Sequence, residues 1–154
     1  MFDVPVDTVY LWLGVAAFSV AVLGVILAVP TTAPPDATRV ADAVDRVAVE
    51  PAGAQRTMQI DATEIRLGPR QISLRNEGGS ATASVTHGPI TPAVDDDQLE
   101  LVLYGRPPNI VFESPAAFAR AVEAAQTRTE WQPAPAQVEI RRVDWGGTDV
   151  TLVG

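Results

Sequence analysis

The 154-residue chain contains no cysteine and no lysine, and His87 is its only histidine. The absence of cysteine excludes disulfides, thiolate nucleophiles and cysteine-ligated metals. Any catalytic triad or histidine-ligated metal site would therefore have to use His87. Basic residues are also scarce, because 11 arginines face 19 carboxylates and the net charge is -8. No basic stripe exists to neutralise phosphates, so nucleic acid is not an expected partner.

This acidity is typical of a halophilic protein. At molar ionic strength the Debye length falls to about 3 Å, so the like charges of an acidic surface repel one another only weakly. Arginine-only basicity also has a simpler source in high-GC coding bias. Neither observation determines a fold.

What the chain does contain is an uninterrupted run of 21 uncharged, almost wholly apolar residues, 9–29. As a helix the run would span roughly 31 Å, close to the thickness of a bilayer's hydrocarbon core. Tyr10 and Trp12 stand at one end, where aromatic rings anchor at the membrane interface. The tail, residues 1–8, carries no basic residue and the run is too long for a signal peptide. We therefore expect an uncleaved transmembrane helix over residues 9–29 in a single-pass membrane protein.

Small residues recur inside this run at intervals of three, four, three and four. Small side chains let a second helix approach closely in lipid, so the spacing predicts a helix-association seam, with chance as the competing explanation. Membrane lipid and other membrane proteins are the expected partners, and homo-oligomerisation is left open. The seam consists of Gly14, Ala17, Ala21, Gly24 and Ala28.

Residues 30–35 are predicted to form a proline-rich linker, and residues 36–154 one soluble α+β domain. A helix is expected over residues 36–48, capped by Asp36, with one apolar face. A second is expected to begin after Ser114, with Pro115 at its first position. Residues 95–104 suit a helix or a strand, and we favour the helix because acidic residues at its start complement the helix dipole.

The remaining pattern predicts a mainly antiparallel sheet with two or three helices covering one face. Turns are expected at residues 76–79 and 146–147, a loop at 88–92 and a short extended piece at 110–112. The expected strands are residues 57–60, 64–67, 71–75, 81–86, 137–145 and 149–153.

Candidate catalytic residues are few. Ser84 lies three residues before His87, but no G-x-S-x-G motif frames any serine, and a histidine before Gly-Pro is more typical of a turn. The run Asp95-Asp96-Asp97 lacks the spacing of a calcium loop and suits a helix start or a solvated surface. Trp131 and Trp145 are more typical of a core than of an exposed recognition patch. The sequence thus predicts no catalytic, cofactor-binding or metal-binding residue.

Three motifs resemble those of a family of small haloarchaeal single-pass membrane proteins of unknown function. They are Phe2-Asp3-Val4-Pro5-Val6-Asp7 before Trp12-Leu13-Gly14; Gly88-Pro89-Ile90-Thr91-Pro92; and Trp145 ahead of Thr151-Leu152-Val153. The resemblance covers most of the chain. It implies a role near type IV pilus-like assembly or secretion components, and it carries over no catalytic residue.

The predicted function is a non-enzymatic accessory component of such a cell-surface assembly, acting by protein association. A membrane-tethered hydrolase using His87 and a minor pilin-like subunit are the alternatives. Orientation is contested, because Arg39 and Arg46 would favour a cytoplasmic domain under the positive-inside rule. The Thr/Pro linker after an N-terminal anchor favours an extracytoplasmic domain, which is the orientation we expect.

Overall fold

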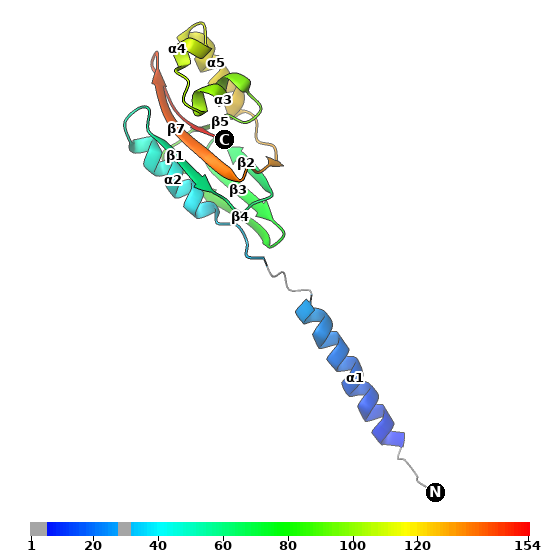
Figure 1. Cartoon of the computed structure of the whole chain (residues 1–154). Helices are drawn as coiled ribbons and strands as arrows, with labels where there is room; N and C mark the ends of the chain where they lie inside the picture. Colours follow the sequence, from blue (N-terminus) through cyan, green and yellow to red (C-terminus); the bar gives the residue numbers. More distant parts are fainter. Residues whose placement is uncertain (1–5, 28–31) are drawn as a thin grey trace. The chain divides into compact units, whose positions relative to one another are not determined.

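The computed structural model describes residues 6–27 and 32–154, and within the first helix it describes the side chains of residues 9–22. The chain divides into two compact units, Met1–Ala33 and Pro34–Gly154 (Figure 1). The first unit contains one helix, α1 (Val6–Leu27), on which all the described side chains are exposed. Among the described residues, no helix reaches the length and hydropathy expected of a membrane span. Residues 28 and 29 of the predicted span lie outside the described residues.

The second unit is an α+β domain, as the sequence predicts. Four helices and eight strands follow one another along the described part of this unit. They are α2 (Ala37–Val49), β1 (Gln55–Gln59), β2 (Glu64–Gly68), β3 (Gln71–Asn76), β4 (Gly79–Ser84), β5 (Ile90–Pro92), α3 (Asp97–Leu103), α4 (Pro108–Val111), α5 (Pro115–Gln126), β6 (Gln132–Pro133), β7 (Gln137–Trp145) and β8 (Thr148–Val153).

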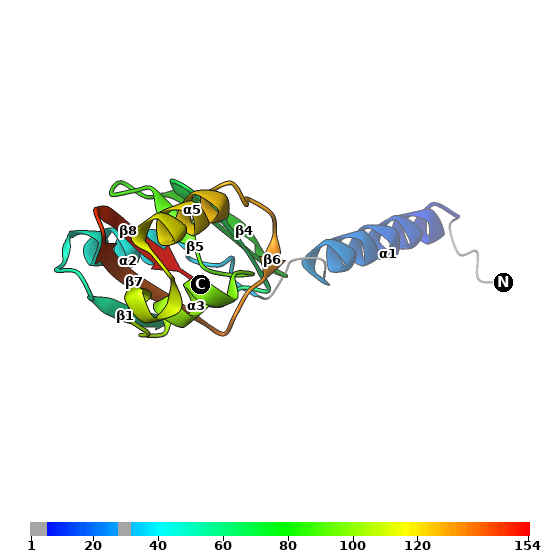
Figure 2. The same cartoon turned by 90° about the horizontal axis from the view of Figure 1, so that it is seen from above.

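The strands form two four-stranded sheets, where we had expected one. The strand order is β1-β7-β8-β5 in the first sheet and β4-β3-β2-β6 in the second. Figure 2 labels the four strands of the first sheet together with β4 and β6 of the second. All pairs are antiparallel except β5 with β8. The sheets meet where the amide of Ile90 in β5 donates to the carbonyl of Pro69, in the turn between β2 and β3, at 2.8 Å.

Helix α2 packs against both sheets and forms the larger core with them. Its N-terminus is capped by Asp36, whose carboxylate accepts from the backbone amide of Arg39 at 3.0 Å. The apolar residues recur at helical spacing, so one stripe of the helix is buried. From α2 this core takes Ala37, Val40, Ala41, Ala43, Val44 and Val47, and Ile65, Leu67, Ile72 and Leu74 from the second sheet join them.

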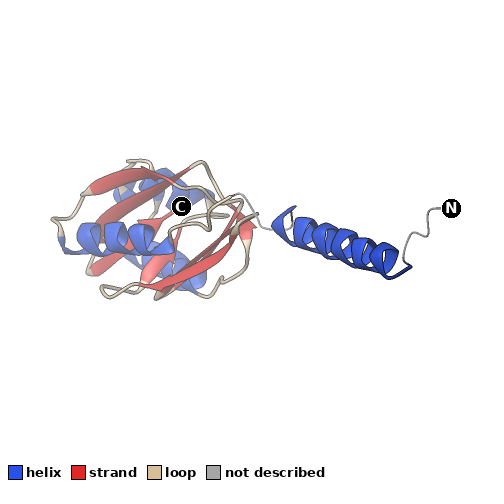
Figure 3. Cartoon of the chain, turned by 90° about the horizontal axis from the view of Figure 1, so that it is seen from below, coloured by secondary structure: helices blue, strands red, loops and turns tan. Residues whose placement is uncertain are grey.

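A second core lies on the opposite face of β7 and β8, under α3 and α5. Leu99, Phe118 and Val122 supply the helical side of this core, and Val143 and Leu152 supply the strand side. The first sheet is therefore covered by helices on both faces (Figure 3), and the prediction of helices on one face was wrong. In β7, Val138 and Ile140 belong to the larger core whereas Val143 belongs to the second, so this strand has buried apolar residues on both faces.

Some predictions of local structure were confirmed and others were wrong. Residues 97–103 are helical, capped by Asp96, whose carboxylate accepts from the amide of Leu99 at 3.1 Å. The extended piece expected at residues 110–112 was wrong, since Pro108–Val111 forms the short helix α4 after Pro107. The loop expected at residues 88–92 contains the strand β5, which pairs with β8 over three residues only.

Candidate functional site

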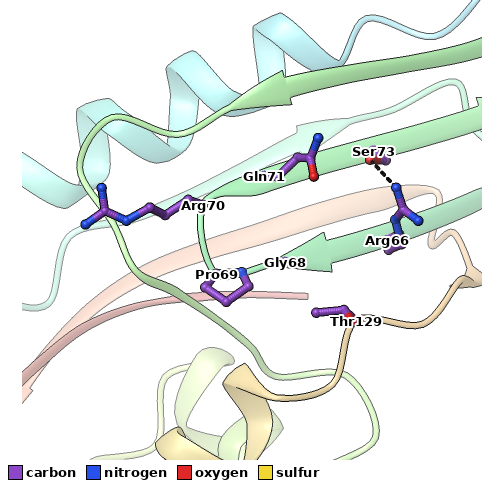
Figure 4. A pocket seen from close by; sticks show the side chains of 7 residues that line it. All are labelled: Arg66, Gly68, Pro69, Arg70, Gln71, Ser73 and Thr129. Carbon is purple, nitrogen blue, oxygen red and sulfur yellow. Dashed lines mark hydrogen bonds between the residues drawn. The ribbon is translucent and has the colours of Figure 1, made fainter.

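A hollow of about 520 Å³ lies on the outer face of the second sheet, where β2 turns into β3 (Figure 4). Its walls come from both strands, from their turn and from the segment that follows α5. No carboxylate lines it. The lining residues are Arg66, Gly68, Pro69, Arg70, Gln71, Ser73 and Thr129.

Strand alternation places the polar residues on this face. In β2, Ile65 and Leu67 point into the core, so Arg66 between them points outward. Ser73 stands directly opposite Arg66 in the antiparallel register of β2 and β3. The same period that builds the core therefore sets a guanidinium beside a hydroxyl.

Ser73 is buried between neighbours from both adjacent strands. Arg66 Nη2 lies 3.4 Å from Ser73 Oγ, a long hydrogen bond, and Thr82 Oγ1 donates to the same oxygen at 3.0 Å. The Ser73 residue is 2% exposed. A hydroxyl that accepts twice keeps its own proton for donation, and no acceptor for that proton occurs among the residues that the structure describes.

Trp131 holds two arginines on this face. Its ring lies 4.9 Å from the guanidinium carbon of Arg66 and 4.6 Å from that of Arg75. Arg75 is also tied to Glu64, whose carboxylate accepts from its Nε at 2.6 Å. Arg66 has no carboxylate partner in the described part of the chain, so its charge is oriented by the tryptophan without being neutralised.

His87 lies in the loop between β4 and β5, beside Asp45 of α2. The backbone amide of His87 donates to Asp45 Oδ1 at 2.7 Å, and the ring Nδ1 lies 3.4 Å from the same oxygen. The amide of Thr86 also donates to this carboxylate, at 2.9 Å and 3.1 Å to its two oxygens. Partial burial raises the pKa of Asp45, but the hydrogen bonds from His87 and Thr86 and the charge of His87 outweigh it, so the pKa is lowered overall.

A smaller hollow of about 270 Å³ adjoins His87. Thr151 is the hydroxyl residue that lines it, and Ser84, the serine nearest to His87 in the sequence, is not among its walls. The structure therefore brings an aspartate to His87 but does not place Ser84 in the adjoining hollow. Its walls are Ala48, His87, Gly88, Pro89, Asp149, Val150 and Thr151.

The three consecutive aspartates diverge. The carboxylate of Asp95 accepts from Gln132, and Asp96 caps α3 and lies 3.9 Å from Arg128. Asp97 is exposed in the first turn of α3. No group of three or more histidine or acidic residues suited to a metal ion occurs within residues 6–27 and 32–154.

A third hollow, of about 470 Å³, is lined by apolar residues together with three acidic residues. The apolar part of the lining includes Leu103, Tyr104 and the segment of residues 133–135, and the acidic residues are Asp95, Asp97 and Glu100. Beside it, the exposed face of α3 combines two carboxylates with two large apolar side chains at helical spacing. That face consists of Asp97, Glu100, Leu101 and Tyr104, with Leu101 46% and Tyr104 62% exposed.

The predicted residues of α1 are exposed where they are described. Tyr10 and Trp12 are 68% and 67% exposed, and Gly14, Ala17 and Ala21 are exposed too. Gly24 lies in α1 beyond the described side chains, and Ala28 lies outside the described residues.

The two tryptophans of the domain differ. Trp145 packs against Phe118 in the second core, with ring centroids 5.9 Å apart, as predicted. Trp131 instead lies on the sheet face against two arginines, and the sequence reasoning missed the polar site around it. The available signal was the hairpin itself, since pairing residues 64–68 with 71–75 places Arg66 opposite Ser73.

Comparison with known proteins identifies the chain's family. Residues 3–143 match a family of unknown function, DUF7283, and the chain belongs to that family. No curated protein and no solved structure matches it.

Proposed function

We propose that the protein is a membrane-anchored, non-enzymatic component of a cell-surface assembly that acts by associating with other proteins. The observation that carries the proposal is the exposure of the apolar side chains described on α1. All 14 side chains described on it, at residues 9–22, are exposed, although none is charged and only Tyr10 and Ser19 carry a hydroxyl. A helix that is apolar all round requires an apolar surrounding, which a bilayer supplies.

Two further features suit α1 to lipid. Ser19, its one hydroxyl residue besides Tyr10 within residues 9–22, donates to the carbonyl of Val15 at 2.8 Å, so that its polar atom is satisfied inside the helix. The apolar run of the sequence also continues past Leu27, the last described residue of α1, to residue 29.

We place the association face of the domain on α3. The carboxylates of Asp97 and Glu100 have no basic partner in the described residues, and the apolar Leu101 and Tyr104 continue the same face. A segment that carries an arginine or lysine next to an apolar side chain would complement both halves. The proposed partner is a component of a type IV pilus-like or secretion assembly, following the resemblance of the sequence motifs.

Membrane attachment and orientation are tested together. We expect the chain to remain with membranes after washing in high salt and alkali, and protease added to intact cells to digest the domain. Digestion only after lysis would place the domain in the cytoplasm. Recovery of the chain in the soluble fraction would contradict the proposal that the protein is anchored in a membrane.

The association face is tested by charge reversal. We expect Glu100→Arg to abolish cross-linking to the assembly components in intact cells without changing the domain's thermal transition. The matched control is Glu123→Arg on α5, which changes the same charge at another exposed position. Equal cross-linking by both variants would move the contact away from α3.

A second candidate function is hydrolysis at His87, because Asp45 lies 3.4 Å from its ring and Thr151 lines the adjoining hollow. In this alternative His87 would be the general base and Thr151 the nucleophile. Incubation of the purified full chain with activated ester substrates would test it. Turnover that is lost in Thr151→Val and in His87→Ala would favour the hydrolase.

A further inference from the structure

We propose that the hollow on the outer face of the second sheet binds a phosphate ester, with Arg66 and Ser73 as the residues that hold the phosphate. The inference is independent of the association face on α3, which lies at a different hollow. It begins from the charge of the lining. In a chain of net charge -8, this hollow is lined by two arginines and no carboxylate.

The donors around Arg66 are arranged for an oxyanion. The only hydrogen bond of its guanidinium is the long one to Ser73, which leaves most of its five N–H groups without an acceptor in the described residues. Ser73 adds a hydroxyl proton, because its oxygen already accepts from Arg66 and Thr82. Charged donors combined with a fixed hydroxyl match the acceptor oxygens of phosphate.

The site is organised before any ligand arrives. Trp131 holds the guanidinium of Arg66 at 4.9 Å, and strand pairing fixes Ser73 opposite it. A ligand would therefore bind with little loss of side-chain freedom at Arg66. Arg70 extends from the β2–β3 turn, away from Ser73, and lies at the rim of the hollow (Figure 4).

The size of the hollow favours an ester over the free ion. A volume of about 520 Å³ lies within the range of small-molecule sites, about 300–1,000 Å³, and exceeds what an inorganic ion requires. Pro69 and Thr129 offer apolar contact beyond the donors. Gly68 keeps this part open, since a Cβ there would lie 4.0 Å from the Thr129 methyl group and 3.6 Å from the Gln71 carbonyl.

The phosphate ester has two sources, a small soluble metabolite or a lipid headgroup, and the experiment distinguishes them. The full chain in neutral detergent is titrated with glycerol phosphate at constant ionic strength, and binding is followed by calorimetry and by tryptophan emission. In a second arm the chain is reconstituted into vesicles with and without an anionic phospholipid, and the glycerol phosphate titration is repeated. Competition by the phospholipid indicates the headgroup, and its absence indicates the soluble ester.

We expect Arg66→Gln to weaken glycerol phosphate binding at least about tenfold, since a hydrogen-bonded charge is lost. Arg70→Gln, at the rim, should weaken it only a few-fold. Gly68→Leu should block binding by filling the hollow while leaving every donor in place. The control is Arg106→Gln, which removes the same charge from an exposed residue beyond α3 and should bind as the unaltered chain does.

Thermal transitions of all four variants identify any that unfold. Should Arg66→Gln fail to fold, Gly68→Leu and Arg70→Gln still test the site, because they remove space and rim charge separately. Absence of saturable binding to the unaltered chain, or equal affinities for Arg66→Gln and Arg106→Gln, would overturn the proposal.

Discussion

Helices α1 and α2 are both rich in alanine and valine, yet they have opposite surroundings. On α1 the side chains described at residues 9–22 are all exposed, whereas six of the 13 residues of α2 are buried. The difference lies in the order of the residues. In α2 charged side chains alternate with apolar ones at the helical period, and in α1 the apolar residues surround the helix.

Of the two helices, α2 contributes buried side chains to a core of the domain. The apolar stripe of α2 is covered by both sheets, so it contributes to the folding free energy of the domain. No side chain described on α1, at residues 9–22, belongs to either core. In the proposed function these side chains are covered by lipid or by a second helix. Substitutions of the same type should therefore have separate consequences in the two helices.

The largest expected effect comes from placing a charge at a valine in each helix. Val44→Asp puts a carboxylate at a position of α2 that is 0% exposed, and we expect it to cost more than about 4 kcal/mol and unfold the domain. Val15→Asp, at a position of α1 that is 50% exposed, should leave the domain's transition unchanged. It should instead release the chain from membranes, because an aspartate at the centre of a span costs about 2.5–3.5 kcal/mol.

Circular dichroism and membrane fractionation of both variants measure this separation. Unfolding of the domain by Val15→Asp would show that α1 contributes to its stability. Retention of Val15→Asp in washed membranes would show that α1 is not the anchor.

The elements that could be predicted from the sequence are those that depend on local rules. Asp36, Asp96 and Ser114 cap their helices through hydrogen bonds to amides three residues later, a local rule that the sequence displays. Strand β5 could not be predicted because Ile90–Pro92 is short, contains proline and is ordered by pairing with β8, about 60 residues away. Its formation depends on tertiary contacts.

The candidate site was harder to predict than the fold. His87 stands out in the sequence because it is unique, but Asp45, its neighbour in space, lies 42 residues away and belongs to another element. The pairing of Arg66 with Ser73 depends on the register of a hairpin, and a shift of one residue would have placed the two side chains on opposite faces of the sheet. Such a site is therefore indicated better by the register of the paired strands than by the types of its residues.

The polar side of α2 gives the next largest effect. Asp45→Ala removes the acceptor for the amides of Thr86 and His87, so we expect a loss of about 1–2 kcal/mol in unfolding free energy. Asp42→Ala is the matched control, because Asp42 is exposed on the same helix and makes no hydrogen bond or ion pair among the described residues. It should change stability by less than about 0.5 kcal/mol. Chemical denaturation measures both, and equal losses would show that helix charge matters rather than the loop contact.

The Asp45 contact should also depend on pH. Because the folded state lowers the pKa of Asp45 below its ordinary 3.8, the ionised carboxylate contributes stability that is fully present above pH 3.8. That contribution is lost as the pH falls through the lower, folded pKa. The stability difference between the unaltered chain and Asp45→Ala should therefore be constant near neutral pH and shrink in acid. A difference that grows in acid would contradict the assigned direction.

A smaller effect is expected on the small-residue seam of α1. Ala17→Leu combined with Gly24→Leu should weaken helix association while keeping membrane insertion, since both changes raise hydrophobicity. The control Val20→Leu adds bulk at an exposed position off the seam and should have little effect. A reporter of transmembrane association, run on the isolated segment and with co-expressed partners, measures the difference. Equal signals for the seam and control variants would show that the spacing of the small residues does not mediate helix association, and α1 would then be an anchor only.

The smallest effect is expected at His87, where the loop contacts α2. The backbone amide of His87, at 2.7 Å from Asp45, makes the short bond, whereas the ring lies 3.4 Å away and its side chain is 54% exposed. His87→Ala keeps the amide, so we expect the unfolding free energy to change by less than about 0.5 kcal/mol and the cellular function to persist. Denaturation and a phenotype assay measure the two outcomes. A destabilisation equal to that of Asp45→Ala would mean that the ring holds the loop against α2. Lost function at unchanged stability would instead assign chemistry to the ring and favour the hydrolase.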